Sequence, residues 1–130
     1  MVKVKKQALI VFTVFVLTVL ISAFTVGCTQ QTAAAGKYIA GVYSGEGNGM
    51  GGTITVTLTV DANTIVSVDE ITDPGETTGL GGKEAIADGT YAAQILEAQS
   101  AEIDGVSGAT ITTGGVQQAT SNALAKALNE

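Results

Sequence analysis

The run DGVSGATITT, residues 104–113, is the stretch whose residue types could most readily do chemistry. It places the carboxylate of Asp104 and the hydroxyls of Ser107 and Thr110 among glycine and alanine. A hydroxyl becomes a nucleophile when a base, most often histidine, takes its proton. The sequence has no histidine, and Gly105-x-Ser107-x-Ala109 lacks the final glycine of the G-x-S-x-G hydrolase motif. A hydrolase is therefore excluded, and the run is either a simple loop or a site that takes its chemistry from elsewhere.

The amino-acid composition excludes further classes of function. Cys28 is the only cysteine, which excludes a disulfide within the chain and any zinc or iron-sulfur site built on several thiolates. Beyond Cys28 there are three lysines, no arginine and twelve acidic residues, a net charge of −9, which excludes nucleic acid as a partner. The acids never fall into the D-x-D-x-D-G spacing of a calcium loop, and we interpret them as a solvated surface with no metal site. A chain so poor in reactive side chains borrows its chemistry from a cofactor, or has none.

The first 28 residues have the composition of an export and anchoring segment. Lys3, Lys5 and Lys6 precede 19 uncharged residues, 8–26, and then Cys28. A signal peptide has an apolar stretch of ~7–15 residues and a spanning helix needs about 20, so the length favours an uncleaved anchor. The small residue Gly27 before the cysteine favours the alternative, since residues 24–28 resemble the lipobox of bacterial lipoproteins, in which the cysteine is lipidated.

Both alternatives place the rest of the chain on the outer face of a bacterial membrane, because the lysines stay on the cytoplasmic side. We expect residues 1–27 to be a lipoprotein signal peptide or a membrane anchor. Residues 28–36 form a polar, small-residue tether, and residues 37–130 form one domain.

Alternation of apolar and polar residues predicts the strands. Residues 53–60, TITVTLTV, alternate strictly, which places four aliphatic side chains on one face and four threonines on the other. We predict further strands at 38–44 and 64–71, the second with a bulge where the alternation slips. Gly47, Gly49 and Gly52 match G-x-G-x-x-G, but a strand follows them instead of a helix, so we interpret them as a hairpin loop or bulge.

The helices are expected in the second half of the chain. Residues 72–82 are turn-like, and residues 83–98 predict two helical pieces interrupted at Asp88-Gly89-Thr90. A final helix is predicted from about residue 113 to residue 128, with Thr112 or Thr113 as its N-cap. Strands first and helices later indicate an α+β fold, a small antiparallel sheet with helices packed on it.

Four blocks of sequence, taken in order, resemble one family. They are GNGMGGTITVTLTVD, ETTGLGG, ILEAQSAEIDGVSGAT and the closing alanine-rich helix. Together they make residues 41–128 similar to the small FMN-binding domain of the C and G subunits of sodium-pumping NADH:quinone reductase, of related ion-translocating oxidoreductases, and of bacterial surface flavin lipoproteins.

The resemblance implies a role for each residue of the run at 104–113. In that family D-x-x-S-G-A-T is the recognition sequence of a flavin transferase, which takes FAD and transfers FMN to the hydroxyl of the last threonine. Every specified position is matched, by Asp104, Ser107, Gly108, Ala109 and Thr110. The resemblance therefore implies that FMN is held on Thr110 by a phosphoester bond, at a helix N-terminus that favours a phosphate.

The resemblance also implies a position for the flavin ring. The loop ETTGLG, 76–81, would lie against the isoalloxazine, and Thr77, Gly79 and Leu80 are the expected pocket residues. Met50 or Tyr43 is a further possible contact, although each also fits a plain core or loop residue. The family usually has proline where Thr78 stands here.

The implied function is that of a lipid-anchored extracytoplasmic electron carrier, not an enzyme in the strict sense. Its covalent FMN would pass electrons from a membrane donor, a quinone or NADH dehydrogenase system, to an external acceptor or reductase partner. The alternative from another class is a cofactor-free surface lipoprotein that acts as a binding or scaffold module.

Overall fold

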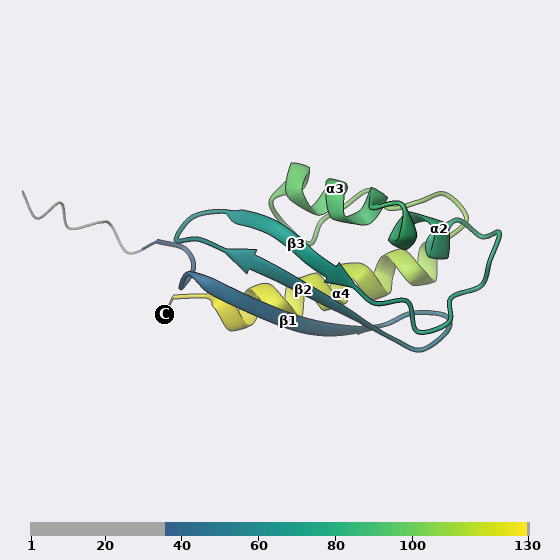
Figure 1. Cartoon of the computed structure of the whole chain (residues 1–130), viewed down its shortest axis with the longest axis horizontal. Helices are drawn as coiled ribbons and strands as arrows, with labels where there is room; N and C mark the ends of the chain where they lie inside the picture. The colour runs from purple at the N-terminus through teal and green to yellow at the C-terminus, as the bar shows by residue number, and fades with distance from the viewer. Residues whose placement is uncertain (1–35, 130) are drawn as a thin grey trace, which may run out of the picture. The chain divides into compact units, whose positions relative to one another are not determined.

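The computed structural model describes residues 36–129, and the predicted signal peptide, Cys28 and most of the tether lie outside these residues. Three strands, β1 (Gly41–Asn48), β2 (Thr53–Val60) and β3 (Ile65–Ile71), form an antiparallel sheet in the order β1-β2-β3. Three helices follow, α2 (Gly82–Ala87), α3 (Thr90–Ala98) and α4 (Thr110–Ala127). The predicted α+β fold with an antiparallel sheet and a C-terminal helix is confirmed (Figure 1).

Strand β2 carries the centre of the core. Its four aliphatic residues are at most 2 % exposed, whereas its threonines lie on the opposite, more open face of the sheet. Burying each aliphatic side chain contributes about 1.5–3 kcal/mol. The core also holds Tyr91 and Ile95 of α3 and the small residues of α4. The alternation in the sequence therefore predicts the buried face correctly.

The first strand differs from its prediction. It runs over Gly41–Asn48 instead of 38–44, and the buried Tyr38 forms an isolated bridge with Leu128. The reason lies in the contact of β1 with α4. A Cβ on Gly45 would lie 2.0 Å from the carbonyl oxygen of Ala119, and one on Gly47 would lie 2.0 Å from that of Gly115. Glycines that suggest a loop in the sequence are thus strand residues packed against a helix backbone.

The expected bulge between β2 and β3 and the expected break between α2 and α3 are both present. The register between β2 and β3 shifts between Thr57 and Leu58 and again between Thr59 and Val60, in agreement with the expected bulge. The interruption between α2 and α3 is also present, with Gly89 in the left-handed region at φ 82°. The side chain of Gln99, at the end of α3, exchanges hydrogen bonds with the backbone of Ile65 at 2.8 and 3.1 Å and so ties α3 to β3.

The start of α4 was predicted three residues too late. The helix begins at Thr110, its N-cap is Ala109, and no side chain caps it, so the assignment of Thr112 or Thr113 as N-cap is wrong. Both threonines lie in the first turns of α4, are less than 9 % exposed and use their hydroxyls in tertiary hydrogen bonds.

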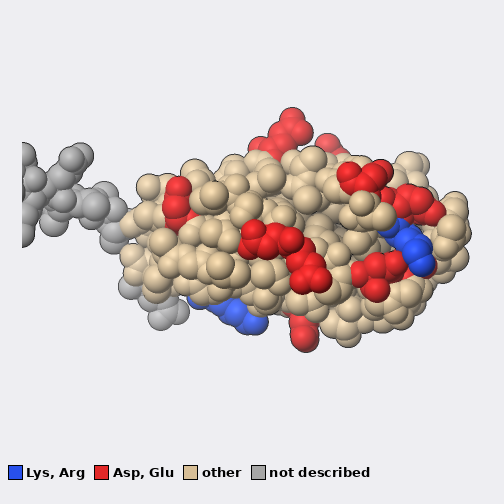
Figure 2. Space-filling model, in the orientation of Figure 1, with Lys and Arg blue, Asp and Glu red and all other residues tan. Residues whose placement is uncertain are grey.

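The acidic residues are mostly on the surface, as expected. Figure 2 shows carboxylates dispersed over the visible face. Glu76 contradicts the interpretation of all acids as solvated, because only 3 % of it is exposed. Within residues 36–129, no helix combines the length and apolar character needed to cross a membrane. The same residues contain no group of three or more His, Cys, Asp or Glu side chains that could hold a metal ion.

Candidate functional site

The loops and helix starts gather at one end of the domain. The turn between β1 and β2, the loop after β3, and the beginning of α4 lie together at the end opposite to the C-terminus (Figure 1). They enclose a hollow of about 240 Å³. Its lining residues come from these three places and are Met50, Glu76, Thr77, Leu80, Gly108, Ala109, Thr110, Ile111 and Thr112.

Thr110 is exposed at the first position of α4. The chain turns into the helix at Gly108, whose φ of 85° lies in the left-handed region that favours glycine. Ala109 follows as the N-cap and its short side chain cannot accept a hydrogen bond from the helix. Thr113 is the first residue of α4 whose N–H donates to a backbone acceptor, the carbonyl of Ala109 at 2.9 Å. The hydroxyl of Thr110 therefore stands beside free N–H groups at the positive end of an 18-residue helix dipole.

The loop over residues 72–81 is held by a carboxylate at each end. Asp73 accepts hydrogen bonds from the N–H groups of Gly75 at 3.0 Å and Glu76 at 2.7 Å, and it pairs with Lys83 at 3.5 Å. Glu84 accepts hydrogen bonds from the N–H groups of Gly79 at 2.8 Å and Gly81 at 3.1 Å. The loop thus has fixed ends although Thr78 occupies the position of the family's proline.

These hydrogen bonds also lower the pKa of both carboxylates, Asp73 and Glu84. The N–H groups of Glu76 and then Gly75, with Lys83 contributing less, lower the pKa of Asp73 below its ordinary value of 3.8. The N–H of Gly79 is the largest cause that lowers the pKa of Glu84 below 4.5. Both groups are therefore ionised at neutral pH and hold the loop as acceptors.

Glu76 links the three segments that form the hollow. One oxygen, Oε1, accepts a hydrogen bond from the N–H of Gly51 at 2.8 Å, and the other, Oε2, accepts one from the hydroxyl of Thr112. A Cβ on Gly49 would lie only 2.3 Å from Oε1, so the glycines of the turn make room for the carboxylate. The sequence places Glu76 in the loop expected beside the ring but does not predict its burial, because nothing in its neighbours signals it.

Three exposed apolar side chains surround the opening of the hollow. Met50 is 49 %, Leu80 43 % and Ile111 53 % exposed. The hydroxyl of Thr77 lies 3.6 Å from the sulfur of Met50, which connects the turn to the loop across the hollow. Ile111 carried no sequence signal of its own, since it stands between threonines in a predicted loop. The site combines an apolar opening with a hydroxyl at a helix N-terminus.

The predicted site residues separate into two groups. Thr77, Leu80, Gly108, Ala109 and Thr110 line the hollow, and so does Met50, one of the two further possible contacts. Gly79, Ser107 and Asp104 are not among its lining residues. Gly79 is in the left-handed region and its N–H is bound by Glu84, while Ser107 is exposed in the turn before Gly108. Tyr43 does not line the hollow either; its hydroxyl donates to the carbonyl of Ile39 at 3.0 Å, and its ring packs on the core.

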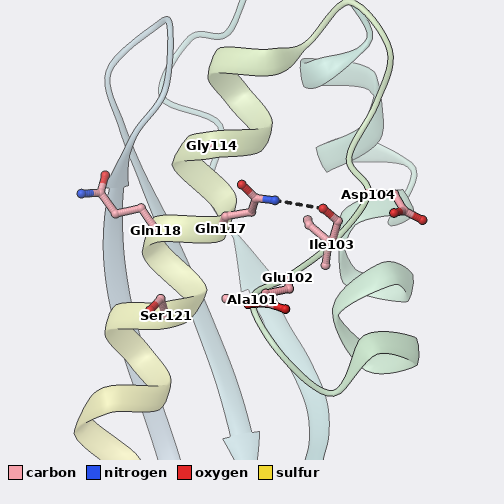
Figure 3. Close-up of a pocket in the computed structure, with 8 residues that line it drawn as sticks. All are labelled: Ala101, Glu102, Ile103, Asp104, Gly114, Gln117, Gln118 and Ser121. Carbon is pink, nitrogen blue, oxygen red and sulfur yellow. Dashed lines mark hydrogen bonds between the residues drawn. The ribbon is translucent and has the colours of Figure 1, made fainter.

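Asp104 lies on a different surface, beside a shallow depression of about 600 Å³. The depression separates the segment 101–104 from the exposed side of α4, where it is lined by Gly114, Gln117, Gln118 and Ser121 (Figure 3). The side chain of Gln117 donates to the carbonyl of Ile103 at 2.9 Å and holds the two walls together. Asp104 is exposed, so it is open to a partner instead of supporting Thr110 from within the domain.

The comparisons with known proteins agree with this geometry. A family model described as the FMN-binding domain matches residues 49–125. The match includes every segment that lines the hollow, from the turn at Met50 to the first turn of α4. No curated protein matches the chain.

Proposed function

The chain belongs to the FMN-binding domain family, and we propose that it is an electron-transfer protein that carries FMN covalently on Thr110. The bond is a phosphoester between the threonine hydroxyl and the FMN phosphate. The single observation that supports it most strongly is the exposed Thr110 hydroxyl at the uncapped start of α4, on the wall of the hollow.

The helix N-terminus favours the phosphate half of the cofactor. Free N–H groups and the helix dipole stabilise a negative charge in the first turn. Gly108 and Ala109 add no bulk beside Thr110, so the backbone can approach the phosphate closely. The residues present therefore fit an esterified phosphate at this position.

The hollow favours the ring half of the cofactor. Met50, Leu80 and Ile111 offer an apolar surface to an aromatic ring, and the polar part of the lining is Glu76 and Thr112, which hydrogen-bond to each other. At about 240 Å³ the hollow is smaller than the roughly 300–1,000 Å³ of pockets that enclose a whole ligand. It would cover the ring in part and leave an edge open, which suits electron exchange with a partner protein. When bound, FMN supplies the reversible acceptance of electrons that no side chain of the domain can provide.

A flavin transferase would attach the cofactor, using FAD as the donor. The lining of the hollow contains no histidine, lysine or thiol that could take a proton from Thr110. The one carboxylate in the lining, Glu76, accepts hydrogen bonds from Gly51 and Thr112, and none to it from Thr110 is present. We therefore assign the base to the transferase, to which the exposed Asp104, Ser107 and Gly108 are available. Thr110 would give its hydroxyl proton to the enzyme's base, and its oxygen would form the phosphoester with AMP as the leaving group.

The proposed location is the outer face of a bacterial membrane. Lipidation of Cys28 after removal of residues 1–27 would anchor the domain there, and a membrane quinone or NADH dehydrogenase system would supply the electrons. Covalent attachment suits this location, because a freely bound flavin would be lost outside the cell. The intact mass of the mature protein tests the anchor, since retention of residues 1–27 would exclude a lipoprotein.

The decisive experiment is flavin fluorescence after denaturing electrophoresis. The full chain is co-expressed with a flavin transferase whose activity is verified on a known substrate protein. We expect a fluorescent band for the wild type and none for Thr110→Val. Thr53→Val is the matched control, because Thr53 is exposed at the start of β2 and does not line the hollow, and it should stay fluorescent.

Two outcomes would exclude covalent FMN on Thr110. One is a dark wild-type band beside an active transferase, which would favour the cofactor-free surface lipoprotein. The other is a Thr110→Val band as bright as the wild type, which would place the flavin elsewhere.

A further inference from the structure

Glu76 is the one acidic side chain within residues 36–129 that is buried. It lies in the wall of the hollow, with one hydrogen bond to each carboxylate oxygen, from the Gly51 N–H and the Thr112 hydroxyl. Burying a carboxylate costs free energy unless other groups compensate its charge. The ion pair between Lys83 and Asp73 is the only one in the part of the chain that the structure describes, so no cation is paired with Glu76.

Hydrogen bonding explains a polar group at this position but does not explain its charge. A glutamine would have nearly the same shape, and its amide oxygen could accept from the Gly51 N–H. Its amide nitrogen could donate to Thr112, whose hydroxyl accepts as well as donates. The two residues therefore differ chiefly in the negative charge that the carboxylate adds to the hollow.

We propose that Glu76 sets the reduction potential of the flavin, by placing a negative charge in the hollow that holds it. This inference rests on the proposed attachment of FMN to Thr110. A fixed negative charge opposes the gain of an electron by a neighbouring group, and it therefore lowers that group's midpoint potential. The effect is strong here because the carboxylate is shielded from water and salt by the turn, the loop and α4. Glu76 is not itself oxidised or reduced; the electrons come from the donor and the protons that accompany them come from water.

The test is a spectroelectrochemical titration at pH 7 of the flavin-loaded full chain. We expect Glu76→Gln to shift the midpoint potential to a more positive value, and the shift to persist in high salt. Glu70→Gln makes the same chemical change at an exposed position of β3 outside the hollow, and it should leave the potential unchanged. An unchanged potential in Glu76→Gln would overturn the proposal.

Glu76→Asp separates the charge from the hydrogen bonds. The shorter side chain keeps the negative charge but cannot reach both Gly51 and Thr112, so we expect a lower melting temperature without the positive shift. If Glu76→Asp moved the potential as far as Glu76→Gln, the effect would be structural and the proposal would be wrong.

A second variant does not depend on replacing the buried residue. Met50 is half-exposed in the same hollow, and Met50→Lys adds a positive charge there while Glu76 stays in place. It should also shift the potential to a more positive value, and failure to do so would count against the proposal even if Glu76→Gln did not fold. A wild-type chain that carries no flavin after co-expression with an active transferase would instead refute the proposed function. Flavin-loaded variants whose midpoint potentials equal that of the wild type would refute this inference alone.

Discussion

The hydroxyl of Thr112 donates a hydrogen bond to the carboxylate of Glu76, across 36 residues of sequence, and both groups are buried. The bond joins the loop after β3 to the first turn of α4, next to the position where FMN is proposed to be attached. It therefore fixes the wall of the hollow relative to Thr110.

Thr112→Val should destabilise the domain. Valine has nearly the same shape but leaves one oxygen of Glu76 buried without this donor, which costs about 1–3 kcal/mol. Urea denaturation followed by circular dichroism measures the loss. Thr112→Ser keeps the hydroxyl and serves as the control, with a smaller loss from the missing methyl group. Equal stability of the valine variant and the wild type would contradict the structural role of this bond.

Gly114 and Gly115 are adjacent in α4 but should respond in opposite directions to alanine. A Cβ on Gly114 would meet nothing within 4 Å, so Gly114→Ala should stabilise the helix by about 0.5–1 kcal/mol. A Cβ on Gly115 would lie 2.7 Å from the carbonyl oxygen of Asn48, so Gly115→Ala should destabilise by about 1–3 kcal/mol through overpacking. Thermal melts of the two variants provide the comparison, and a Gly115→Ala variant as stable as the wild type would contradict the close packing of α4 on β1.

Thr113→Val should loosen the segment that leads into α4. The hydroxyl of Thr113 lies 3.0 Å from that of the buried Tyr91 and accepts a hydrogen bond from the N–H of Val106 at 3.3 Å. Removing it should cost about 1 kcal/mol and raise hydrogen exchange at Val106. Thr113→Ser is the control that retains both bonds, and Tyr91→Phe should leave Val106 protected. Unchanged exchange at Val106 in the valine variant would argue against this contact.

Stability should be level near neutral pH and fall in acid. The chain has no histidine to titrate near neutrality, and hydrogen bonds lower the pKa of Asp73 below 3.8 in the folded state, with the N–H of Glu76 as the largest cause. The folded protein then binds a proton less readily than the unfolded chain, so the stabilisation is complete well above pH 4 and is lost as the pH falls through the folded pKa. Melting temperatures between pH 2 and pH 8 should show this decrease.

Asp73→Asn identifies the contribution of this one group. Asparagine can still accept from the two N–H groups but has no carboxyl to protonate, so the decrease in acid should be shallower than in the wild type. An identical pH profile would mean that other carboxylates with lowered pKa values, such as Asp61 and Asp88, account for the acid sensitivity.

The sequence predicted correctly those structural features that depend on residues close together in the chain. The alternation of TITVTLTV predicted which face of β2 is buried, and the break at Asp88-Gly89-Thr90 predicted the division between α2 and α3. The four blocks at 41–128 also led to the family that the comparison supports over residues 49–125. These features follow from local backbone preference and from side-chain spacing, which the sequence contains directly.

The sequence did not predict those features that depend on contacts between residues far apart in the chain. The strand glycines Gly45 and Gly47 resemble a loop until α4 is placed against them, and the start of α4 shifts because Thr112 and Thr113 bond to Glu76 and Tyr91 instead of capping the helix. Asp104 and Thr110 belong to one motif but lie at different depressions of the surface.

The sequence by itself thus determined the buried face of β2, the division between α2 and α3, and the D-x-x-S-G-A-T run. Only the tertiary structure decided that Glu76 is buried in the wall of the hollow. The physical reason is that burial of a charge depends on donors supplied by Gly51 and Thr112, and only folding brings these to the carboxylate.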